Sequence, residues 1–288
     1  MPIDTHSNVF LFADDTKLSN RVPDIDNKIQ QDLDLLCRWS EVWQLRFNAD
    51  KCKVMHIGKQ QQPQDYYMNT ELGRVKLEVV HIEKDLGVNF DEGLVFKDHV
   101  LIQTQKCNKL LGMIRRCFTY LDLDNMPTLY KVIVRPHLEY CNVVWHPRYK
   151  RETELLEKVQ RRATKLVPSI RKLPYHERLR YLKLPSLYYR RARGDMIECF
   201  KYVTGIYRTS YPILQLDNAS STRGNSLKLK KLPAMKATRS NFFSRRITNA
   251  WNRLPNDVVT SPNLNVFKNR LDKYWNCHWY CLDAEWFM

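Results

Sequence analysis

The chain has 288 residues and a formal net charge of +16, and 43% of its residues are hydrophobic. It is long enough to bury a sizeable core, and this composition is not typical of a disordered polymer. No apolar run approaches the ~20 residues that span a bilayer, and residues 1–20 lack the basic and apolar regions of a signal peptide. With 8 scattered cysteines, we expect a reduced, intracellular protein without a membrane anchor.

The charge is distributed unevenly along the chain. Residues 1–98 contain 12 Lys and Arg against 17 Asp and Glu, a net charge of −5. Residues 148–193 contain 15 against 4, a net charge of +11, and residues 223–253 contain 9 against none. One such block is commonly a solvated helix face, but two blocks after an acidic third predict a polyanionic partner such as nucleic acid.

The first third is predicted to combine short strands with one helix. The apolar run Val9–Phe12 predicts a strand that ends in a tight turn at Ala13-Asp14-Asp15, because an aspartate side chain can bond the local backbone. A helix is predicted to open at Pro23-Asp24 with Asp24 as its N-cap. Its apolar face at helical spacing consists of Ile25, Ile29, Leu33, Leu36 and Trp43. Strands are expected over residues 53–57, 75–79 and 86–90, with a loop over 59–70.

Beyond residue 95 the pattern becomes helical. Steps of four and three residues predict an amphipathic helix of about five turns, with a stripe formed by Val100, Thr104, Cys107, Leu111, Ile114 and Phe118. Residues 127–146 predict a helix that is broken near Pro136, and Leu155–Leu166 predict another. The polar stretch 217–226 is the best linker candidate. The predicted fold class is α+β, in three regions: 1–95, 96–216 and 217–288.

Adjacent aspartates at the end of an apolar strand are suited to metal chemistry. Nucleotidyl transfer uses two divalent ions about 3.5–4 Å apart, which act on the attacking and leaving oxygens. Magnesium takes oxygen ligands and keeps several waters, so that a few carboxylates suffice. An isolated Asp-Asp pair is more often a solvated turn, so the surrounding sequence decides between these two interpretations.

The surrounding sequence resembles a known family. Phe12-Ala13-Asp14-Asp15 is similar to the FADD motif of reverse transcriptases, and the run Phe10–Leu18 resembles its form in LINE-type, jockey-like non-LTR retrotransposons. Later segments resemble further family motifs in the family's order: Trp39–Met55, Asp85–Val88 with His99, Leu129–Tyr130, Pro136–Cys141, Val144–Pro147, and Ala250–Pro255 with Phe267–Leu271. The resemblance covers nearly the whole chain. It implies a partial palm, made of β-hairpins and a helix, followed by a mainly helical thumb and a carboxy-terminal region.

The resemblance also implies roles for individual residues. Asp14 would be the carboxylate that binds Mg²⁺, and Asp15 its weaker neighbour. Lys51 would lie near the phosphates of the incoming nucleotide and donate a proton to pyrophosphate; alternatively it is a solvated turn residue. Leu86, Gly87 and Val88 would hold the primer end, with Gly87 allowing close backbone approach; alternatively Gly87 marks an ordinary bulge.

One departure from the family limits the expected activity. The family's third catalytic aspartate lies on an earlier palm strand, whereas only 13 residues precede Asp14 and Asp4 is their sole acid. The fingers, the first half of the palm and an amino-terminal endonuclease also have no counterpart. We therefore expect a truncated RNA-directed DNA polymerase that is inactive alone. Its hairpin would have an exposed apolar edge, where the palm strand normally packs.

Basic residues in the third quarter of the chain predict contacts to RNA and to primer–template. Arg161, Arg162 and Lys165 share about one helix turn, and the track would continue with Arg190, Arg191 and Arg193. Tyr188 and Tyr189 could stack on unpaired bases, or they could be core residues.

Three alternatives remain open. The chain could be a non-catalytic RNA- or DNA-binding module, or a subunit whose site is completed by a partner chain. Cys277-His278 with Cys281 could begin a structural zinc site, although such a site needs four ligands and no second pair lies nearby. A nuclear location is implied only by the family resemblance.

Overall fold

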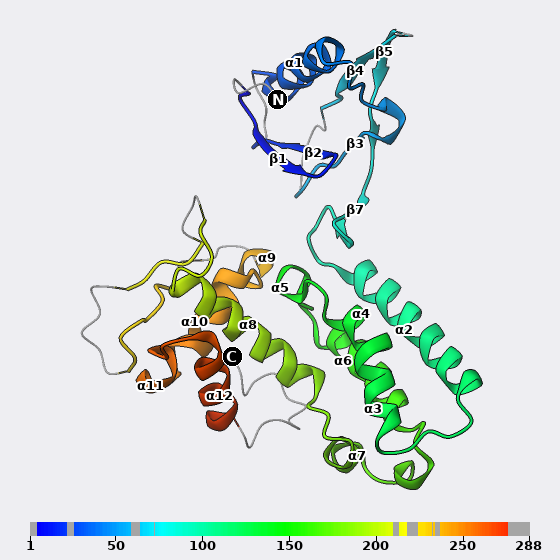
Figure 1. Cartoon of the computed structure of the whole chain (residues 1–288). Helices are drawn as coiled ribbons and strands as arrows, with labels where there is room; N and C mark the ends of the chain where they lie inside the picture. Colours follow the sequence, from blue (N-terminus) through cyan, green and yellow to red (C-terminus); the bar gives the residue numbers. More distant parts are fainter. Residues whose placement is uncertain are drawn as a thin grey trace. The chain divides into compact units, whose positions relative to one another are not determined.

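The computed structural model describes residues 5–21, 26–58, 64–71, 73–209, 213–217, 224–231, 233 and 237–275 (Figure 1). It combines helices with small two-stranded sheets, which confirms the mixed α and β composition of the prediction. The chain divides into two units. One comprises Met1–Asp85 and Phe90–Gly93, and the other comprises Leu86–Asn89 and Leu94–Met288. The zinc candidate at Cys277–Cys281 lies outside the described residues.

The first unit contains one long helix and a series of short strands. Its elements are β1 (Asn8–Phe12), β2 (Asp15–Ser19), α1 (Lys28–Val42), η1 (Ala49–Lys51), β3 (Lys53–Val54), β4 (Tyr67–Thr70), β5 (Gly73–Lys76), β6 (Glu78–Val79) and β7 (Ile82–Asp85). β1 pairs with β2 and β4 pairs with β5, both antiparallel, whereas β3 and β6 are parallel. β7 pairs with β8 (Val88–Asp91).

A small apolar core holds α1 against β4. It consists of Leu33, Cys37, Tyr66, Met68 and Leu77. The predicted loop over residues 59–70 is therefore wrong in its second half. Tyr66 and Met68 alternate with exposed or half-exposed neighbours and are buried as in a strand. Leu77 divides the strand predicted over 75–79 into β5 and β6, and the strand predicted over 53–57 ends at Val54.

The ends of α1 differ from the prediction. The helix begins after Asn27, which is its N-cap, and Asp24 lies outside the described residues. Trp43 was expected on the apolar face but is 64% exposed. It follows the last helical residue, Val42, so it no longer continues the helical stripe.

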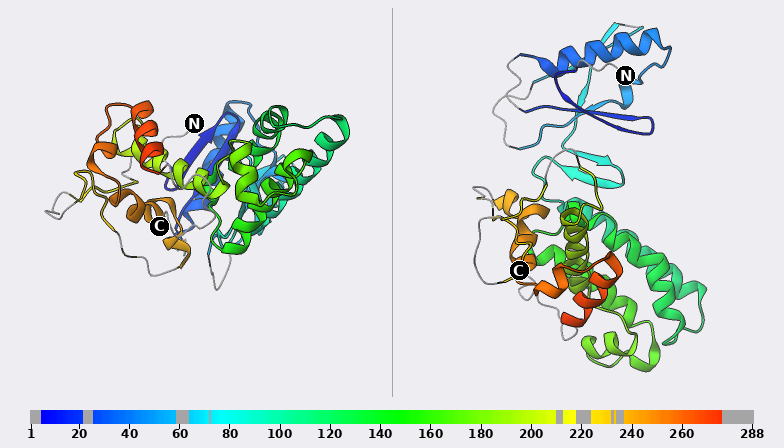
Figure 2. Two further views of the ribbon diagram at one scale, coloured as in Figure 1. Left: turned by 90° about the horizontal axis from the view of Figure 1, so that it is seen from below. Right: turned by 60° about the vertical axis from the view of Figure 1, so that its left-hand side comes forward.

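The second unit is helical. Its elements are α2 (Lys97–Cys117), α3 (Asn125–Leu129), η2 (Tyr130–Val134), α4 (Arg135–Glu139), α5 (Asn142–Trp145), α6 (Lys150–Thr164), η3 (Pro168–Ile170), α7 (Tyr175–Tyr181), α8 (Leu187–Val203), α9 (Ala237–Ser240), α10 (Phe243–Asn252), α11 (Asn256–Val259) and α12 (Leu264–Tyr274). α2 and α6 pack along one another (Figures 1 and 2).

The predicted stripe on α2 is confirmed except at its end. Val100, Cys107, Leu111 and Ile114 are buried. Phe118 was expected to continue the stripe, but it is the C-cap with extended backbone, and it is 42% exposed. The helix has already ended at Cys117, so Phe118 is not directed onto the same face.

The helix predicted over residues 127–146 is interrupted near Pro136, as expected. Tyr130–Val134 form a π-helical turn, and Pro136 lies in the first turn of α4. Proline has no N–H to donate to residue i−4, and the wide turn before it accommodates that loss. The helix ends at Glu139, and Cys141 adopts a φ of 55° before α5.

One apolar core of the second unit surrounds α8. Met196, Cys199 and Phe200 from α8 are buried together with Trp251 from α10 and Phe267 from α12. Within the linker candidate 217–226, the described residue Asn225 has a buried side chain. Its amide donates hydrogen bonds to the carbonyl oxygens of Trp251 and Leu254, at 3.0 and 3.1 Å.

Candidate catalytic hairpin and nucleic-acid interface

The Asp-Asp motif lies at the tip of a β-hairpin. β1 and β2 pair from Asn8↔Ser19 to Phe12↔Asp15, which leaves Ala13 and Asp14 as a two-residue turn. Ala13 adopts a φ of 52°, the left-handed region that the first position of a type II′ turn requires. The predicted strand and tight turn are thus confirmed. Both Asp14 and Asp15 are exposed.

A buried aspartate on α1 fixes the chain just before this hairpin. The side chain of Asp32 is buried and accepts hydrogen bonds from the backbone N–H groups of His6 and Ser7, at 2.9 and 2.7 Å. A buried carboxylate is tolerated only when it is paired in this way. Sequence analysis missed Asp32, although an acid beside Leu33 on the apolar face of a helix was a usable signal. The second strand of the hairpin, β2, is linked to β7 by an ion pair between Lys17 and Asp85.

The described residues do not assemble a full magnesium site around Asp14. Among them, no group of three or more histidine, cysteine or acidic side chains could hold a metal ion. Asp14 and Asp15 supply two carboxylates, from the turn and from the first residue of β2. A two-metal centre needs further oxygen ligands to bridge and orient both ions. The hairpin therefore fits only part of the predicted metal site.

Lys51 lies in the short helix η1 and is exposed. Its turn is capped by Asn48, whose side chain accepts from the Asp50 N–H at 3.1 Å. Within the described part of the chain, no hydrogen bond or ion pair links Lys51 to Asp14 or Asp15. The structure thus leaves the predicted role of Lys51 untested.

The predicted primer-grip residues form the turn of the β7–β8 hairpin. Leu86 and Gly87 have φ angles of 45° and 84°, so the expected strand begins only at Val88. The close approach at Gly87 is made by Tyr140. A Cβ added to Gly87 would lie 3.2 Å from the Tyr140 ring, and the Tyr140 hydroxyl donates to the Leu86 carbonyl at 3.0 Å. Val88 is buried, and Leu86 is 48% exposed.

His99 is hydrogen-bonded to Asn89, the residue that follows Val88 in this hairpin. Its Nδ1 accepts a hydrogen bond from the Asn89 N–H at 3.2 Å, and its ring contacts Trp145 with the centroids 4.9 Å apart. The side chain is buried, which lowers the pKa of His99 to about 4. The neutral ring is therefore the form that accepts the Asn89 hydrogen bond.

This buried histidine predicts a loss of stability in mild acid. In the unfolded chain the His99 pKa is near 6.5, so below that pH the unfolded state takes up a proton that the folded state does not. Stability should fall as the pH is lowered from 6.5 towards 4, by about 3 kcal/mol for this group. Urea unfolding at pH 7 and pH 4.5 should show a smaller acid loss in His99→Gln than in the original chain. His81→Gln, at an exposed histidine, is the control; equal acid losses in all three chains would contradict the prediction.

The two groups of predicted basic contacts differ in exposure. On α6, Arg162 and Lys165 are exposed, and Arg162 donates to the Asn108 side chain at 2.8 Å. Arg161 is half-buried, with its guanidinium 5.1 Å from the ring centre of Tyr175. Arg162 and Lys165 are therefore the members of this group that solvent reaches most freely.

The three arginines on α8 contact carboxylate or aromatic side chains of the same chain. Arg190 forms a two-bonded ion pair with Glu139, and Arg193 forms one with Asp272. Arg191 is buried, and its guanidinium lies 5.1 Å from the ring centre of Tyr188. The prediction that Arg191 contacts phosphates is wrong for this conformation, and Arg190 and Arg193 already have carboxylate partners. α8 is the central helix of its unit, so its side chains face protein on several sides.

The neighbouring tyrosines are also core residues. Tyr188 and Tyr189 are 7% and 2% exposed, and the Tyr189 hydroxyl donates to Asp272 at 2.8 Å. They are not available for stacking on bases. Sequence analysis did not single out four further exposed basic residues. Arg171 and Lys172 follow η3, Arg180 lies in α7, and Lys183 follows α7. The only signal for them was the net charge of their block.

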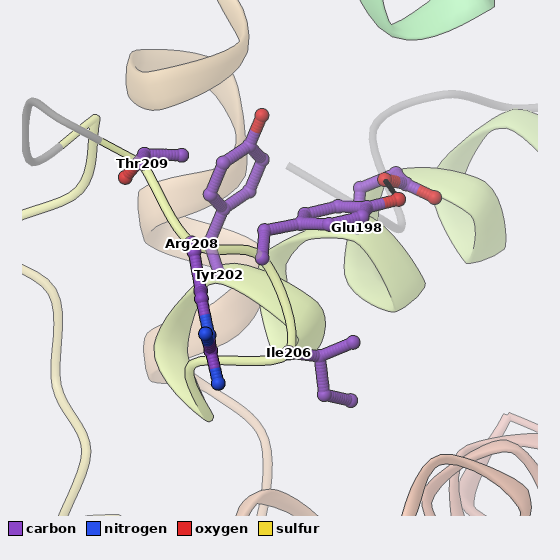
Figure 3. Close-up of a pocket in the computed structure, with 6 residues that line it drawn as sticks. Glu198, Tyr202, Ile206, Arg208 and Thr209 are labelled. Carbon is purple, nitrogen blue, oxygen red and sulfur yellow. Dashed lines mark hydrogen bonds between the residues drawn. The ribbon is translucent and has the colours of Figure 1, made fainter.

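A separate hollow lies at the end of α8 (Figure 3). It is an open depression of about 570 Å³ lined by Glu198, Tyr202, Ile206, Tyr207, Arg208 and Thr209. Glu198 accepts hydrogen bonds from Lys201 and from the Tyr207 hydroxyl, at 2.7 and 2.8 Å. Its carboxylate is thus already satisfied, and none of the predicted site residues lines this hollow.

No family model, curated protein or solved structure matches the chain. Among the described helices, none is both long and apolar enough to cross a membrane.

Proposed function

We propose that these 288 residues are the carboxy-terminal part of an RNA-directed DNA polymerase of a LINE-type, non-LTR retrotransposon. The observation that supports this proposal best is the position of the FADD-like motif at the tip of the β1–β2 hairpin. That position presents the Asp14 carboxylate to solvent from a turn that joins two paired strands. A template-dependent primer-extension assay tests the proposal.

In this proposal, the described chain supplies one part of the catalytic centre. Asp14 and Asp15 are the Mg²⁺ ligands, and a further carboxylate comes from a polymerase segment outside these residues. Bound Mg²⁺ would activate the attacking hydroxyl and stabilise the leaving phosphate. Without the additional ligand, the chain alone is inactive.

A nucleic-acid surface on the second unit forms the other part of the proposal. It consists of exposed basic residues at the end of α6, directly after η3, and in and just after α7, here called the α6–α7 basic surface: Arg162, Lys165, Arg171, Lys172, Arg180 and Lys183. Side chains of this kind bind phosphates without reading sequence. RNA and primer–template duplex are the proposed partners, which agrees with a nuclear location for the element's life cycle.

Binding to RNA by the full chain should weaken steeply with salt. Each phosphate contact releases counterions, so log affinity falls with log salt by roughly 0.7–0.9 per contact. Arg162→Ala combined with Lys165→Ala should reduce the slope by about 1–2 and weaken binding to all sequences alike. The measurement is a salt titration by fluorescence anisotropy on RNA and on primer–template.

The matched control is Lys84→Ala, which removes an exposed lysine of β7 in the first unit. It should leave the slope unchanged. A slope near zero for the original chain, or an equal slope in the double variant, would contradict the α6–α7 basic surface as the contact region.

A non-catalytic nucleic-acid-binding module is the second candidate, and the same basic surface favours it. The two candidates differ in the first unit. A binding module should keep its affinity for nucleic acid when Asp14 is replaced, whereas a polymerase should lose its activity. A third arrangement, in which a partner chain supplies the missing carboxylate, predicts activity only when that chain is added.

A further inference from the structure

Tyr181 is an exposed aromatic residue within the α6–α7 basic surface. It is the last residue of α7, and it is 58% exposed. In the described part of the chain, neither its ring nor its hydroxyl takes part in a hydrogen bond or an aromatic contact. Arg180 precedes it and Lys183 follows two residues later, and both are exposed. A flat aromatic ring is therefore presented to solvent among positive charges.

The exposure of Tyr181 follows from the way in which α7 packs against α6 (Figure 1). Leu179 and Leu182 are buried, and they lie on the inner face of this turn. The Tyr175 hydroxyl donates a hydrogen bond to the buried Glu157 of α6, at 2.5 Å. These contacts hold α7 in place, so the ring of Tyr181 is displayed from a packed helix. A ligand that binds it has little backbone ordering to offset.

The charge around Tyr181 indicates the class of ligand. Residues 171–183 contain five Lys and Arg against one acid, Glu177, a net charge of +4. Four of these basic residues are exposed, namely Arg171, Lys172, Arg180 and Lys183. A polyanion fits this charge. Nucleic acid is the polyanion that also offers flat faces on which an aromatic ring can stack.

The ring further separates single-stranded from double-stranded nucleic acid. In a duplex the face of each base is covered by its neighbours, so a side chain on a protein surface reaches phosphates and groove edges only. In a single strand an unpaired base can lie on an aromatic ring, and every base has a π-face that allows this. Basic side chains combined with an exposed aromatic ring are thus typical of single-strand binding.

We propose that Tyr181 stacks on an unpaired base and that the α6–α7 basic surface holds a single-stranded segment of RNA. The basic side chains contact the phosphates, and one base lies on the ring. Duplex nucleic acid binds the same surface through its phosphates alone. This selection of single strands rests on the proposed nucleic-acid function. It assigns to Tyr181 the stacking role that was predicted for Tyr188 and Tyr189, which are buried.

Two probes test the proposal by fluorescence anisotropy with the full chain. One is a labelled oligouridylate of about 20 nucleotides, and the other is the same strand paired with its complement. Tyr181→Ala should weaken binding to the single strand at least about fivefold and leave binding to the duplex unchanged. The salt slope should stay the same on both probes, because a tyrosine neutralises no phosphate.

Two further variants separate the aromatic ring from other effects. Tyr181→Phe keeps the ring without the hydroxyl, and it should bind both probes as the original chain does. Tyr274→Ala is the matched control, because Tyr274 is the last residue of α12 and is 47% exposed. It should also bind both probes like the original chain. Both tyrosines are exposed, so circular dichroism of all variants should match that of the original chain.

The outcomes distinguish this proposal from the proposed nucleic-acid surface. Single-strand binding that Tyr181→Ala leaves unchanged, or weakens no more than duplex binding, would overturn the stacking role of Tyr181. So would a Tyr181→Phe chain that binds as weakly as Tyr181→Ala. In these cases the salt dependence remains, and the basic surface stands. An original chain that binds neither probe, or binds without salt dependence, would overturn the surface itself and the stacking role with it.

Discussion

Replacing Asp14 with alanine is expected to remove nearly all template-dependent nucleotide incorporation, once the chain is joined to a polymerase segment that supplies the remaining palm carboxylate. Asp14 is exposed at the tip of the β1–β2 hairpin, where its carboxylate could bind Mg²⁺ directly. Lys51→Ala is the comparison, because a group that assists proton transfer contributes about 10²–10⁴-fold. The effect of Asp14→Ala should be the larger one.

The assay is incorporation of labelled deoxynucleotides on an RNA template with a DNA primer and Mg²⁺. The 288-residue chain alone should give none, since two carboxylates do not hold two metal ions in position, and small misplacements of reacting groups can reduce rates ~10²-fold. If the chain alone incorporates nucleotides and Asp14→Ala abolishes that activity, the prediction that its catalytic centre is incomplete is wrong. Small and equal effects of Asp14→Ala and Lys51→Ala in the completed enzyme would place the catalytic centre elsewhere.

The largest effect on stability is expected for Asp195→Ala. Asp195 on α8 and Arg246 on α10 form a two-bonded ion pair, with both N–O distances 2.8 Å, and their side chains are only 7% and 9% exposed. Arg246 also donates to the carbonyl oxygens of Val143 and Asn241, at 2.9 and 3.0 Å. Removing the carboxylate leaves a buried guanidinium without its counter-charge, which typically costs 3–5 kcal/mol.

Urea unfolding followed by circular dichroism measures this loss. Asp272→Ala is the matched control, because Asp272 pairs with Arg193 in the same two-bonded way but the two side chains are 26% and 24% exposed. Its loss should be smaller, since solvent screens the remaining charge. Equal losses in the two variants would show that burial does not set the strength of the Asp195–Arg246 pair.

Much of the local structure could be predicted from the sequence, because short-range periodicity determines it. The spacing of Val100, Cys107 and Ile114 predicted α2, and the apolar run before Asp14 predicted the first strand of the hairpin. The ends of elements were less predictable. Trp43 and Phe118 continue the helical spacing in sequence, but each helix ends one residue earlier.

The candidate site was predictable only where local sequence determines it. The exposed turn at Asp14 follows from a strand, a short turn and a strand. The burial of Arg191 does not follow from local sequence. An arginine in a basic block looks the same in the sequence whether it is exposed to solvent or buried near a carboxylate such as Glu157, which attracts the positive charge of Arg191. The Tyr140 contact at Gly87 joins residues more than fifty positions apart, and no local pattern indicates it.

The position of α8 has a consequence for where the chain can be divided. α8 packs against α6 on one side and against α10 and α12 on another. A truncation within residues 217–226 would remove α10 and α12, which supply the partners of Met196 and Phe200, while leaving α8 attached to α6. The helices on both sides of that stretch should therefore fold and unfold cooperatively, as one foldon.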